Sequence, residues 1–155
     1  MCSDLLTSKD SGKHKYIFIK YTFMTDIFSK RKRSALMASV KSKNTDIELK
    51  LIKELKFRGI KGFELHADMI GRPDIVFKNQ KLAIFCDGDY WHGYGFAERK
   101  SKMKRFWLNK INGNLLRDKQ INKELRNAHW KVLRFWGHEI KNDSALCVTK
   151  IEKSL

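Results

Sequence analysis

The apolar residues of this chain recur at two different spacings, which predict helices and strands in alternation. Residues 44–59 follow the helical period, because their apolar side chains fall on one face of a helix. A second helical region is expected over residues 101–128, with a break or bend near Gly113, and a third over residues 143–155.

Shorter apolar segments between these helices predict strands. Residues 61–66 form a short candidate, and residues 130–136 form a longer one that we expect to be buried. The runs 73–77 and 81–85 have the composition of two strands joined by a turn at Asn79–Gln80. The order helix, strands, helices, strand, helix predicts a mixed α/β domain with a central sheet.

The charge of the chain indicates a polyanionic partner. Its 155 residues include 33 Lys and Arg against 17 Asp and Glu, which gives a formal charge of +16. A folded domain this basic is typical of nucleic-acid binding, and we favour that reading over a basic surface that only confers solubility.

The cysteines and the hydropathy of the chain indicate the cellular compartment of the protein. The three cysteines are scattered and form no CxxC pair, which favours a reducing, cytoplasmic setting over a disulfide scaffold. No apolar run has the length of a membrane span, so we expect no membrane association.

The N-terminal residues differ from the rest of the chain. Residues 1–23 combine a polar stretch with a short β-prone run, and Met24 then opens a segment that resembles a natural start. We expect 1–23 to be an extension outside the core, with an added edge strand as the alternative, and 24–155 to form the functional domain.

A basic cluster precedes a further expected helix, which comes before the one over residues 44–59. It consists of Lys30, Arg31, Lys32 and Arg33. Such a run is most often a solvated face, but its place before a helix makes a phosphate-gripping arm equally plausible.

Two acids and a histidine surround the expected hairpin. With a two-residue turn, Asp74 lies opposite Phe85 and Arg72 lies opposite Asp87, so that the two aspartates share one face of the sheet. Two converging carboxylates would suit Mg²⁺, which prefers oxygen ligands and keeps several waters. His92 is the nearest candidate for a base that activates a water. The alternatives are a turn acid and an ordinary structural histidine.

Three segments together resemble a known family. They are SKNTDIELKLIKEL at 42–55, GRPDIVF…LAIFCDGDYWHG at 71–93, and RFWLNKINGNLLRD at 105–118 with the later HWKVLRFW. From about Phe28 onward the chain resembles the very short patch repair (Vsr) endonucleases. The resemblance implies a restriction-endonuclease-like, three-layer α/β domain with a central mixed sheet flanked by helices. It also implies nicking of DNA next to a T:G mismatch, with one or two Mg²⁺ ions.

The resemblance assigns roles to individual positions. Asp74 matches the metal-binding aspartate, Cys86 the residue that lends a backbone carbonyl to the metal, and His92 the catalytic histidine. Asp87 stands where the best-studied members have a histidine, and its implied role is that of a ligand or water-holder. Glu48 matches a glutamate that reaches metal-bound water, although a favourable charge in the first turn of a helix explains it equally well.

Two features depart from the family pattern. The wider nuclease superfamily places a lysine on its second strand, whereas this chain has Asp87-Gly88-Asp89 there. The positions that correspond to the family's structural zinc ligands are Tyr94, Phe96, Asp118 and His138. Because tyrosine and phenylalanine do not suit Zn²⁺, we expect this zinc to be absent and Asp118 to pair with His138.

Aromatic residues next to the histidine resemble the family's DNA wedge. Tyr90, Trp91 and Trp107 match aromatics that insert into the base stack, with core packing as the alternative for each and an even choice for Trp107. Nearby basic residues that could hold the DNA backbone include Lys104 and Arg105.

The sequence thus predicts a Mg²⁺-dependent, monomeric endonuclease that acts on mismatched double-stranded DNA. By resemblance, its partners include mismatch-repair proteins and a cytosine methyltransferase. The alternatives are a same-fold nuclease of a restriction or mobile-element system, and a non-catalytic protein that binds distorted DNA.

Overall fold

The structure is a computed structural model that describes residues 29–38 and 43–155. Residues 1–28, and with them the expected extension 1–23, lie outside the described residues, so the predicted domain boundary stays a prediction. The elements are α1 (Lys30–Ala38), α2 (Asp46–Phe57), β1 (Glu64–Leu65), β2 (Ile75–Phe77), β3 (Leu82–Asp87), α3 (Phe96–Arg99), the 3-10 turn η1 (Lys100–Lys102), α4 (Arg105–Asn127), β4 (Lys131–Trp136), α5 (Gly137–Asn142) and α6 (Ser144–Glu152).

The sheet is mixed and has the order β1-β2-β3-β4. The strands β1, β2 and β3 pair in antiparallel fashion, whereas β3 and β4 run parallel. The pairs Ile75–Ile84, Val76–Ala83 and Phe77–Leu82 follow the register predicted from the hairpin. A central mixed sheet flanked by helices confirms the predicted fold class.

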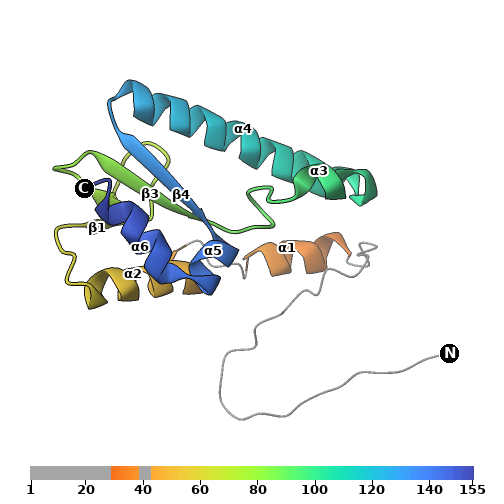
Figure 1. The fold of residues 1–155 in the computed structure, drawn as a ribbon. Coiled ribbons are helices and arrows are strands. Elements are labelled where there is room, and N and C mark those ends of the chain that lie inside the picture. Colours follow the sequence, from red (N-terminus) through yellow and green to blue (C-terminus); the bar gives the residue numbers. More distant parts are fainter. Residues whose placement is uncertain (1–28, 39–42) are drawn as a thin grey trace, which may run out of the picture.

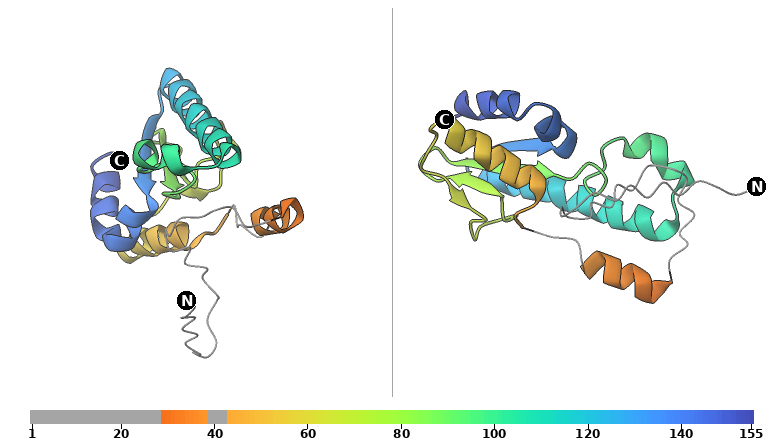
Figure 2. Two further views of the ribbon diagram at one scale, coloured as in Figure 1. Left: turned by 90° about the vertical axis from the view of Figure 1, so that its right-hand side faces the viewer. Right: turned by 90° about the horizontal axis from the view of Figure 1, so that it is seen from below.

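Helices cover both faces of this sheet (Figures 1 and 2). On one face, α2, α5 and α6 pack over the main core, in which Leu51, Ile84 and Ile151 are fully buried. On the other face, α4 crosses the sheet and buries Leu125 against Ala83 and Phe85. The molecule therefore has three layers, with the sheet in the middle.

Several details differ from the sequence prediction. The basic cluster that was expected to precede a helix forms the first turn of α1. Helix α4 runs unbroken through Gly113, since a single exposed glycine costs a helix only about 1 kcal/mol and packing against the sheet outweighs that cost. The strand expected over 61–66 shrinks to Glu64–Leu65. The short helix α5 directly follows β4 and was not predicted.

None of the helices in the described part of the chain combines the length and the apolar character needed to cross a lipid bilayer.

Candidate active site at the ends of β2 and β3

Asp74 is fixed by the hairpin at the point where β2 begins. Its backbone N–H donates to the Ile84 carbonyl at 3.0 Å, and its carbonyl accepts from the His66 N–H at 3.0 Å. Its carboxylate Oδ2 accepts from the Cys86 backbone N–H at 2.7 Å. Both neighbouring strands therefore hold this carboxylate in place.

Asp74 belongs to a group of three potential metal ligands. One ligand atom from each of Glu48, His66 and Asp74 lies within 4.8 Å of the other two, and this is the one such group among the residues that the structure describes. Glu48 comes from the first turn of α2, His66 follows β1, and Asp74 precedes β2. Two carboxylates and an imidazole form a donor set that suits a divalent cation.

Glu48 is a buried charge with a defined environment. It is only 3% exposed, and its two oxygens accept from the Asn44 backbone N–H at 2.8 Å and from the Thr45 hydroxyl at 2.6 Å. The Nε2 atom of His66 lies 3.7 Å from Glu48 Oε2. Glu48 thus both stabilises the start of α2 and reaches the potential metal group, so the two readings of this residue are compatible.

The electrostatics of Asp74 fit a cation-binding role. Burial raises its pKa to about 6, and the nearby Glu48 carboxylate adds to this rise, while the hydrogen bond from Cys86 and the charge of His66 oppose it. Burial thus disfavours the ionised form of Asp74. A bound cation would stabilise that form, because carboxylate ligands bind metals when they are deprotonated.

Asp87 lies outside the potential metal group. It is 5% exposed, and its two oxygens accept from Arg134 Nε at 2.6 Å and Arg134 Nη2 at 2.8 Å. The sequence argument placed Asp74 and Asp87 around one cation, whereas the structure gives Asp74 the neighbours Glu48 and His66. The sequence argument considered the hairpin alone, whereas Glu48 and His66 reach Asp74 from α2 and from the residue after β1.

Cys86 contributes through its backbone. Burial raises the pKa of its thiol, and the carboxylates of Asp74 and Glu48 raise it further, so the thiol stays protonated and is a poor nucleophile. Its N–H holds Asp74, as described above. The predicted role of its carbonyl as a metal ligand stays a prediction.

His92 follows β3 and is held by a carboxylate from α4. Its Nδ1 atom lies 2.7 Å from Asp118 Oδ2 and 3.4 Å from Asp87 Oδ1. Burial lowers the pKa of His92, but the hydrogen bond to Asp118 and the charges of Asp87 and Asp118 together raise it above its ordinary value. Because Nδ1 faces Asp118, the ring presents Nε2 on its opposite side.

Comparison with known proteins now decides the family. The sequence model of the family described as DNA mismatch endonuclease Vsr matches residues 25–98. The DNA mismatch endonuclease Vsr of Escherichia coli strain K12 is 33% identical over 130 residues, which cover 79% of this chain and 83% of that protein. The chain belongs to the Vsr family. It is therefore a DNA endonuclease, a hydrolase of phosphodiester bonds.

Other relatives carry a different name. The type II nicking enzyme V.NmeDIP of Neisseria meningitidis serogroup C is 34% identical over 133 residues, covering 84% of this chain and 90% of that enzyme. The type II nicking enzyme V.HpaIIP of Haemophilus parainfluenzae is 34% identical over 135 residues, covering 85% and 96% respectively. This chain thus matches Vsr-family proteins of both names over most of their length.

The aromatic residues expected to contact DNA form one cluster in this Vsr-family chain. The ring centroids of Tyr90 and Trp91 are 4.9 Å apart, and that of Trp107 lies 5.7 Å from Trp91 and 6.5 Å from Tyr90. Trp107 is 8% exposed and forms the base of the cluster, whereas the adjacent Phe106 is 48% exposed. The geometry therefore favours packing for Trp107 and leaves Tyr90 and Trp91, both half-buried, as wedge candidates.

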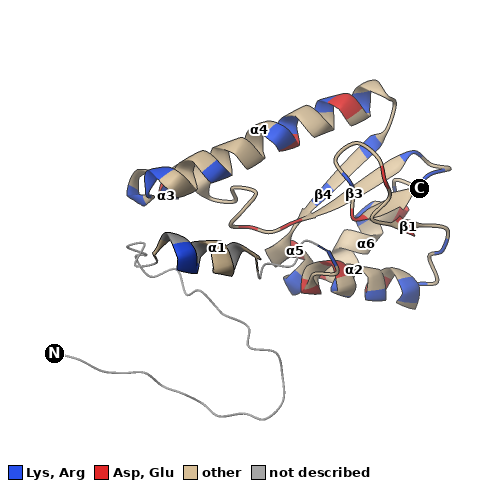
Figure 3. Cartoon of the chain, turned by 180° about the vertical axis from the view of Figure 1, so that it is seen from behind, with Lys and Arg blue, Asp and Glu red and all other residues tan. Residues whose placement is uncertain are grey.

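Basic residues accompany the aromatic cluster. Lys104 and Arg105 are exposed at the start of α4, and Figure 3 shows further Lys and Arg residues along α3 and α4. Lys30, Arg31 and Arg33 belong to α1, where Arg31 is exposed and the side chains of Lys30 and Arg33 lie outside the described residues. Their contact with DNA stays a prediction.

The positions assigned to the family's zinc have a different arrangement. His138 donates its backbone N–H to Asp89 Oδ1 at 3.3 Å, and its Nδ1 lies 2.7 Å from the same oxygen. The Tyr94 ring lies 4.3 Å from the His138 ring. The predicted pair of Asp118 with His138 is therefore wrong, since Asp118 faces His92 instead. The expected absence of zinc stays a prediction.

Asp118, Arg134 and His66 are site residues whose roles the sequence analysis missed. Asp118 lies on the face of α4 that carries the buried Ile111 and Leu125, so a carboxyl group on an inward-facing stripe was the available signal. Arg134 lies within a strand expected to be buried, and a charged residue in that position requires a partner. His66 carried no comparable signal.

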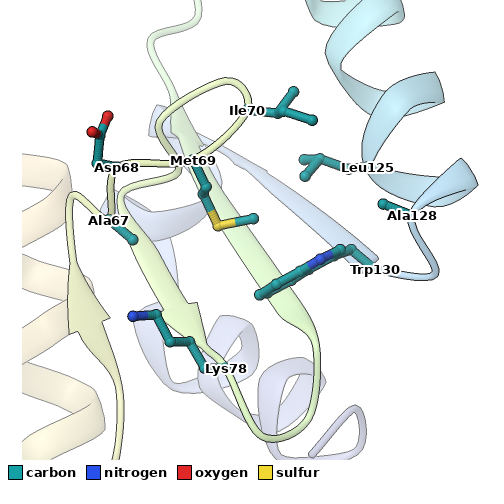
Figure 4. A pocket seen from close by; sticks show the side chains of 8 residues that line it. All are labelled: Ala67, Asp68, Met69, Ile70, Lys78, Leu125, Ala128 and Trp130. Atoms are coloured by element: carbon teal, nitrogen blue, oxygen red, sulfur yellow. The ribbon is translucent and has the colours of Figure 1, made fainter.

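A cavity of about 420 Å³ lies apart from these groups. Its lining comes from the loop after β1, from the C-terminal end of α4 and from Trp130 (Figure 4), and none of the site's acids or histidines lines it. The cavity therefore takes no part in the arrangement described above.

Proposed function

We propose that this protein is a Mg²⁺-dependent endonuclease that nicks one strand of duplex DNA at or next to a T:G mismatch in very short patch repair. The observation that carries the proposal is the group of possible metal ligands Glu48, His66 and Asp74, and the His92–Asp118 pair supplies a candidate base. The name of the Escherichia coli relative, a DNA mismatch endonuclease, supports the mismatch substrate.

The proposed chemistry divides between the two groups. Glu48 and Asp74, with His66, would hold the cation, which when bound supplies polarisation of a phosphoryl oxygen. His92 would accept a proton from the attacking water at Nε2, while Asp118 holds Nδ1 and stabilises the resulting imidazolium.

The aromatic cluster supports a preference for mismatches. Insertion of an aromatic ring into the base stack costs a few kcal/mol, and the cost is least at a weak base pair. Tyr90 and Trp91 directly precede His92 in the chain, so a ring inserted at a mismatch would bring the neighbouring phosphate toward the proposed base.

A nicking assay tests the proposal. Matched and T:G duplexes of the same sequence are incubated with the full chain in Mg²⁺ or in EDTA, with Asp74→Ala as the control for contaminating nucleases. We expect one cut strand, only in Mg²⁺ and mainly in the T:G duplex. Equal cleavage of both duplexes would remove the mismatch assignment, and undiminished cleavage in EDTA would remove the metal.

The second candidate is a nicking enzyme of a restriction system. The relatives named type II nicking enzymes favour it. In this case we expect nicking to depend strongly on the bases that surround the mismatch, which a library of flanking sequences would reveal. A lack of cleavage with Mg²⁺, Mn²⁺ or Ca²⁺ would favour the third candidate, a non-catalytic protein that binds distorted DNA.

The proposed setting follows from the same family membership. The protein would act as a monomer in the cytoplasm, together with mismatch-repair proteins and a cytosine methyltransferase. Co-purification of the chain with such a methyltransferase, and its mass in solution, would test these two points.

A further inference from the structure

Arg134 donates hydrogen bonds to three side chains near His92, and it also lies over an aromatic ring. Its Nε and Nη2 donate to the two oxygens of Asp87 at 2.6 and 2.8 Å. Its Nη2 also donates to Asp118 Oδ1 at 2.9 Å, and its Nη1 donates to Asn122 Oδ1 at 3.1 Å. Arg134 thus binds β3 and α4 from its place on β4, and its guanidinium lies 4.5 Å from the centre of the Phe85 ring.

Two carboxylates lie within reach of the same imidazole nitrogen. His92 Nδ1 is 2.7 Å from Asp118 Oδ2 and 3.4 Å from Asp87 Oδ1. If Nδ1 binds one carboxylate, the orientation of the imidazole ring is fixed. If Nδ1 alternates between two carboxylates, the ring has two orientations. The choice of partner therefore decides where Nε2 points.

We propose that Arg134 is a positioning residue that commits His92 to Asp118 by fully occupying Asp87. The paired hydrogen bonds engage both oxygens of Asp87, which is the arrangement that guanidinium and carboxylate groups form most strongly. The remaining contact to Asp118 Oδ1 turns the other oxygen of Asp118 toward His92. The inference rests on the proposed use of His92 as the base.

Burial makes this arrangement necessary. The side chains of Arg134, Asp87 and Asp118 are 19%, 7% and 15% exposed. Without the guanidinium, two poorly solvated carboxylates would repel each other, and Asp87 would be free to compete for Nδ1. A lysine would supply the charge but not the planar set of donors that joins Asp87, Asp118 and Asn122.

Histidine nitrogen NMR tests the inference on the full chain without DNA. In the wild type at a pH above the titration of His92, the ¹⁵N shifts should show a protonated Nδ1 and an unprotonated Nε2, assigned by comparison with His92→Asn. In Arg134→Met we expect Nδ1 to stay protonated, since Asp87 and Asp118 both face this nitrogen, while the ring-proton signals of His92 shift or broaden as the ring turns toward Asp87. The double variant Asp87→Asn with Arg134→Met should restore the wild-type ring-proton signals, since the competing carboxylate is gone.

Kinetics supply the second readout. Arg134→Met should lower kcat about 10- to 100-fold with little change in KM, as is typical for residues that orient a catalytic group. Arg134→Lys should recover only part of the loss, and Asp118→Asn with Arg134→Met should be no slower than Asp118→Asn alone. Multiplied effects in this double variant, or unchanged ring-proton signals of His92 in Arg134→Met, would overturn the inference.

Arg58→Met is the matched control. Arg58 also donates several side-chain hydrogen bonds, to Glu54, Thr149 and Glu152, but it joins α2 to α6 on the other face of the sheet. Its loss should lower the melting temperature without changing kcat or the His92 signals. If no duplex is nicked by the wild type, the proposed function fails, while the NMR comparison still decides the role of Arg134.

Discussion

His92 Nδ1 lies 2.7 Å from Asp118 Oδ2, although 26 positions separate the two residues in the chain. The contact joins the segment after β3 to the middle of α4, so it depends on the packing of this helix over the sheet. It also fixes the ring of the one histidine that immediately follows the aromatic wedge candidates.

The first prediction concerns this contact. In Asp118→Asn the neutral amide cannot stabilise a protonated His92, so we expect kcat for nicking to fall by roughly 10²- to 10⁴-fold. Binding of a T:G duplex should change little. Single-turnover nicking and gel-shift titration measure the two effects, and Glu124→Gln, on the same helix, should retain full activity.

The second prediction concerns Asp74 and catalysis. Asp74→Ala removes a carboxylate from the Glu48–His66–Asp74 group, so nicking should be lost while affinity for DNA is nearly retained. Isothermal titration of the variant with Mg²⁺ should show that binding of the metal ion is lost as well. Wild-type nicking rates in this variant would contradict the assignment of the metal group.

The third prediction concerns Asp74 and stability in the absence of metal. The pKa of Asp74 is raised from 3.8 to about 6 in the folded state, so folding opposes its ionisation. This cost is absent below about pH 4, where the group is protonated in both states, grows as the pH rises, and is complete above about pH 6.

Asp74→Asn should therefore stabilise the metal-free protein above pH 6 and not below pH 4. Because one pKa unit corresponds to about 1.4 kcal/mol, we expect a gain of roughly 1–3 kcal/mol. Thermal unfolding at pH 4, 6 and 8 checks this expectation. Asp68→Asn, at a carboxylate that is 97% exposed, serves as the control and should leave the pH dependence unchanged.

The fourth prediction concerns salt. Each phosphate contact releases counterions, so the logarithm of the DNA affinity should fall linearly with that of the salt concentration. Replacing Lys104 and Arg105 with alanine should reduce the slope by about 1–2. Lys56 and Lys153, exposed at the end of α2 and near the C-terminus, provide a matched pair whose removal should change the slope less.

The fifth prediction concerns Gly93, the residue after His92. Its φ is +82°, and a Cβ added there would lie 2.9 Å from Leu115 Cδ2. Gly93→Ala should destabilise the fold by about 1–3 kcal/mol and disturb His92. Gly113→Ala is the counterpart: nothing lies within 4 Å of its added Cβ, so it should stabilise α4 by about 0.5–1 kcal/mol. Denaturant unfolding compares the two.

The local parts of this fold were predictable because short-range rules determine them. The hairpin register followed from one turn and from strand alternation, and the structure pairs Phe77 with Leu82 as expected. The break at Gly113 was a wrong prediction because helix propensity is weak compared with the packing of a long helix on a sheet.

The site was only partly predictable, for a related reason. Asp74 and His92 stand in a compact segment that already contains the family pattern, so their positions were visible in the sequence. The partners of these residues come from distant elements: Glu48 and His66 meet Asp74, and Asp118 meets His92. Such pairings depend on tertiary packing, which neither spacing nor composition encodes.

Helix α4 carries Trp107 near its start and Asp118 about three turns further along. Trp107 supports the rings that would meet the DNA, and Asp118 orients the proposed base. One helix therefore carries residues for both DNA contact and proton transfer. If the proposed function holds, a tilt of α4 caused by ring insertion at a distorted base step would also move Asp118 and with it the imidazole of His92. Recognition of the substrate and proton transfer would then be coupled through one helix, and a correctly paired duplex, which resists ring insertion, would leave that helix in place.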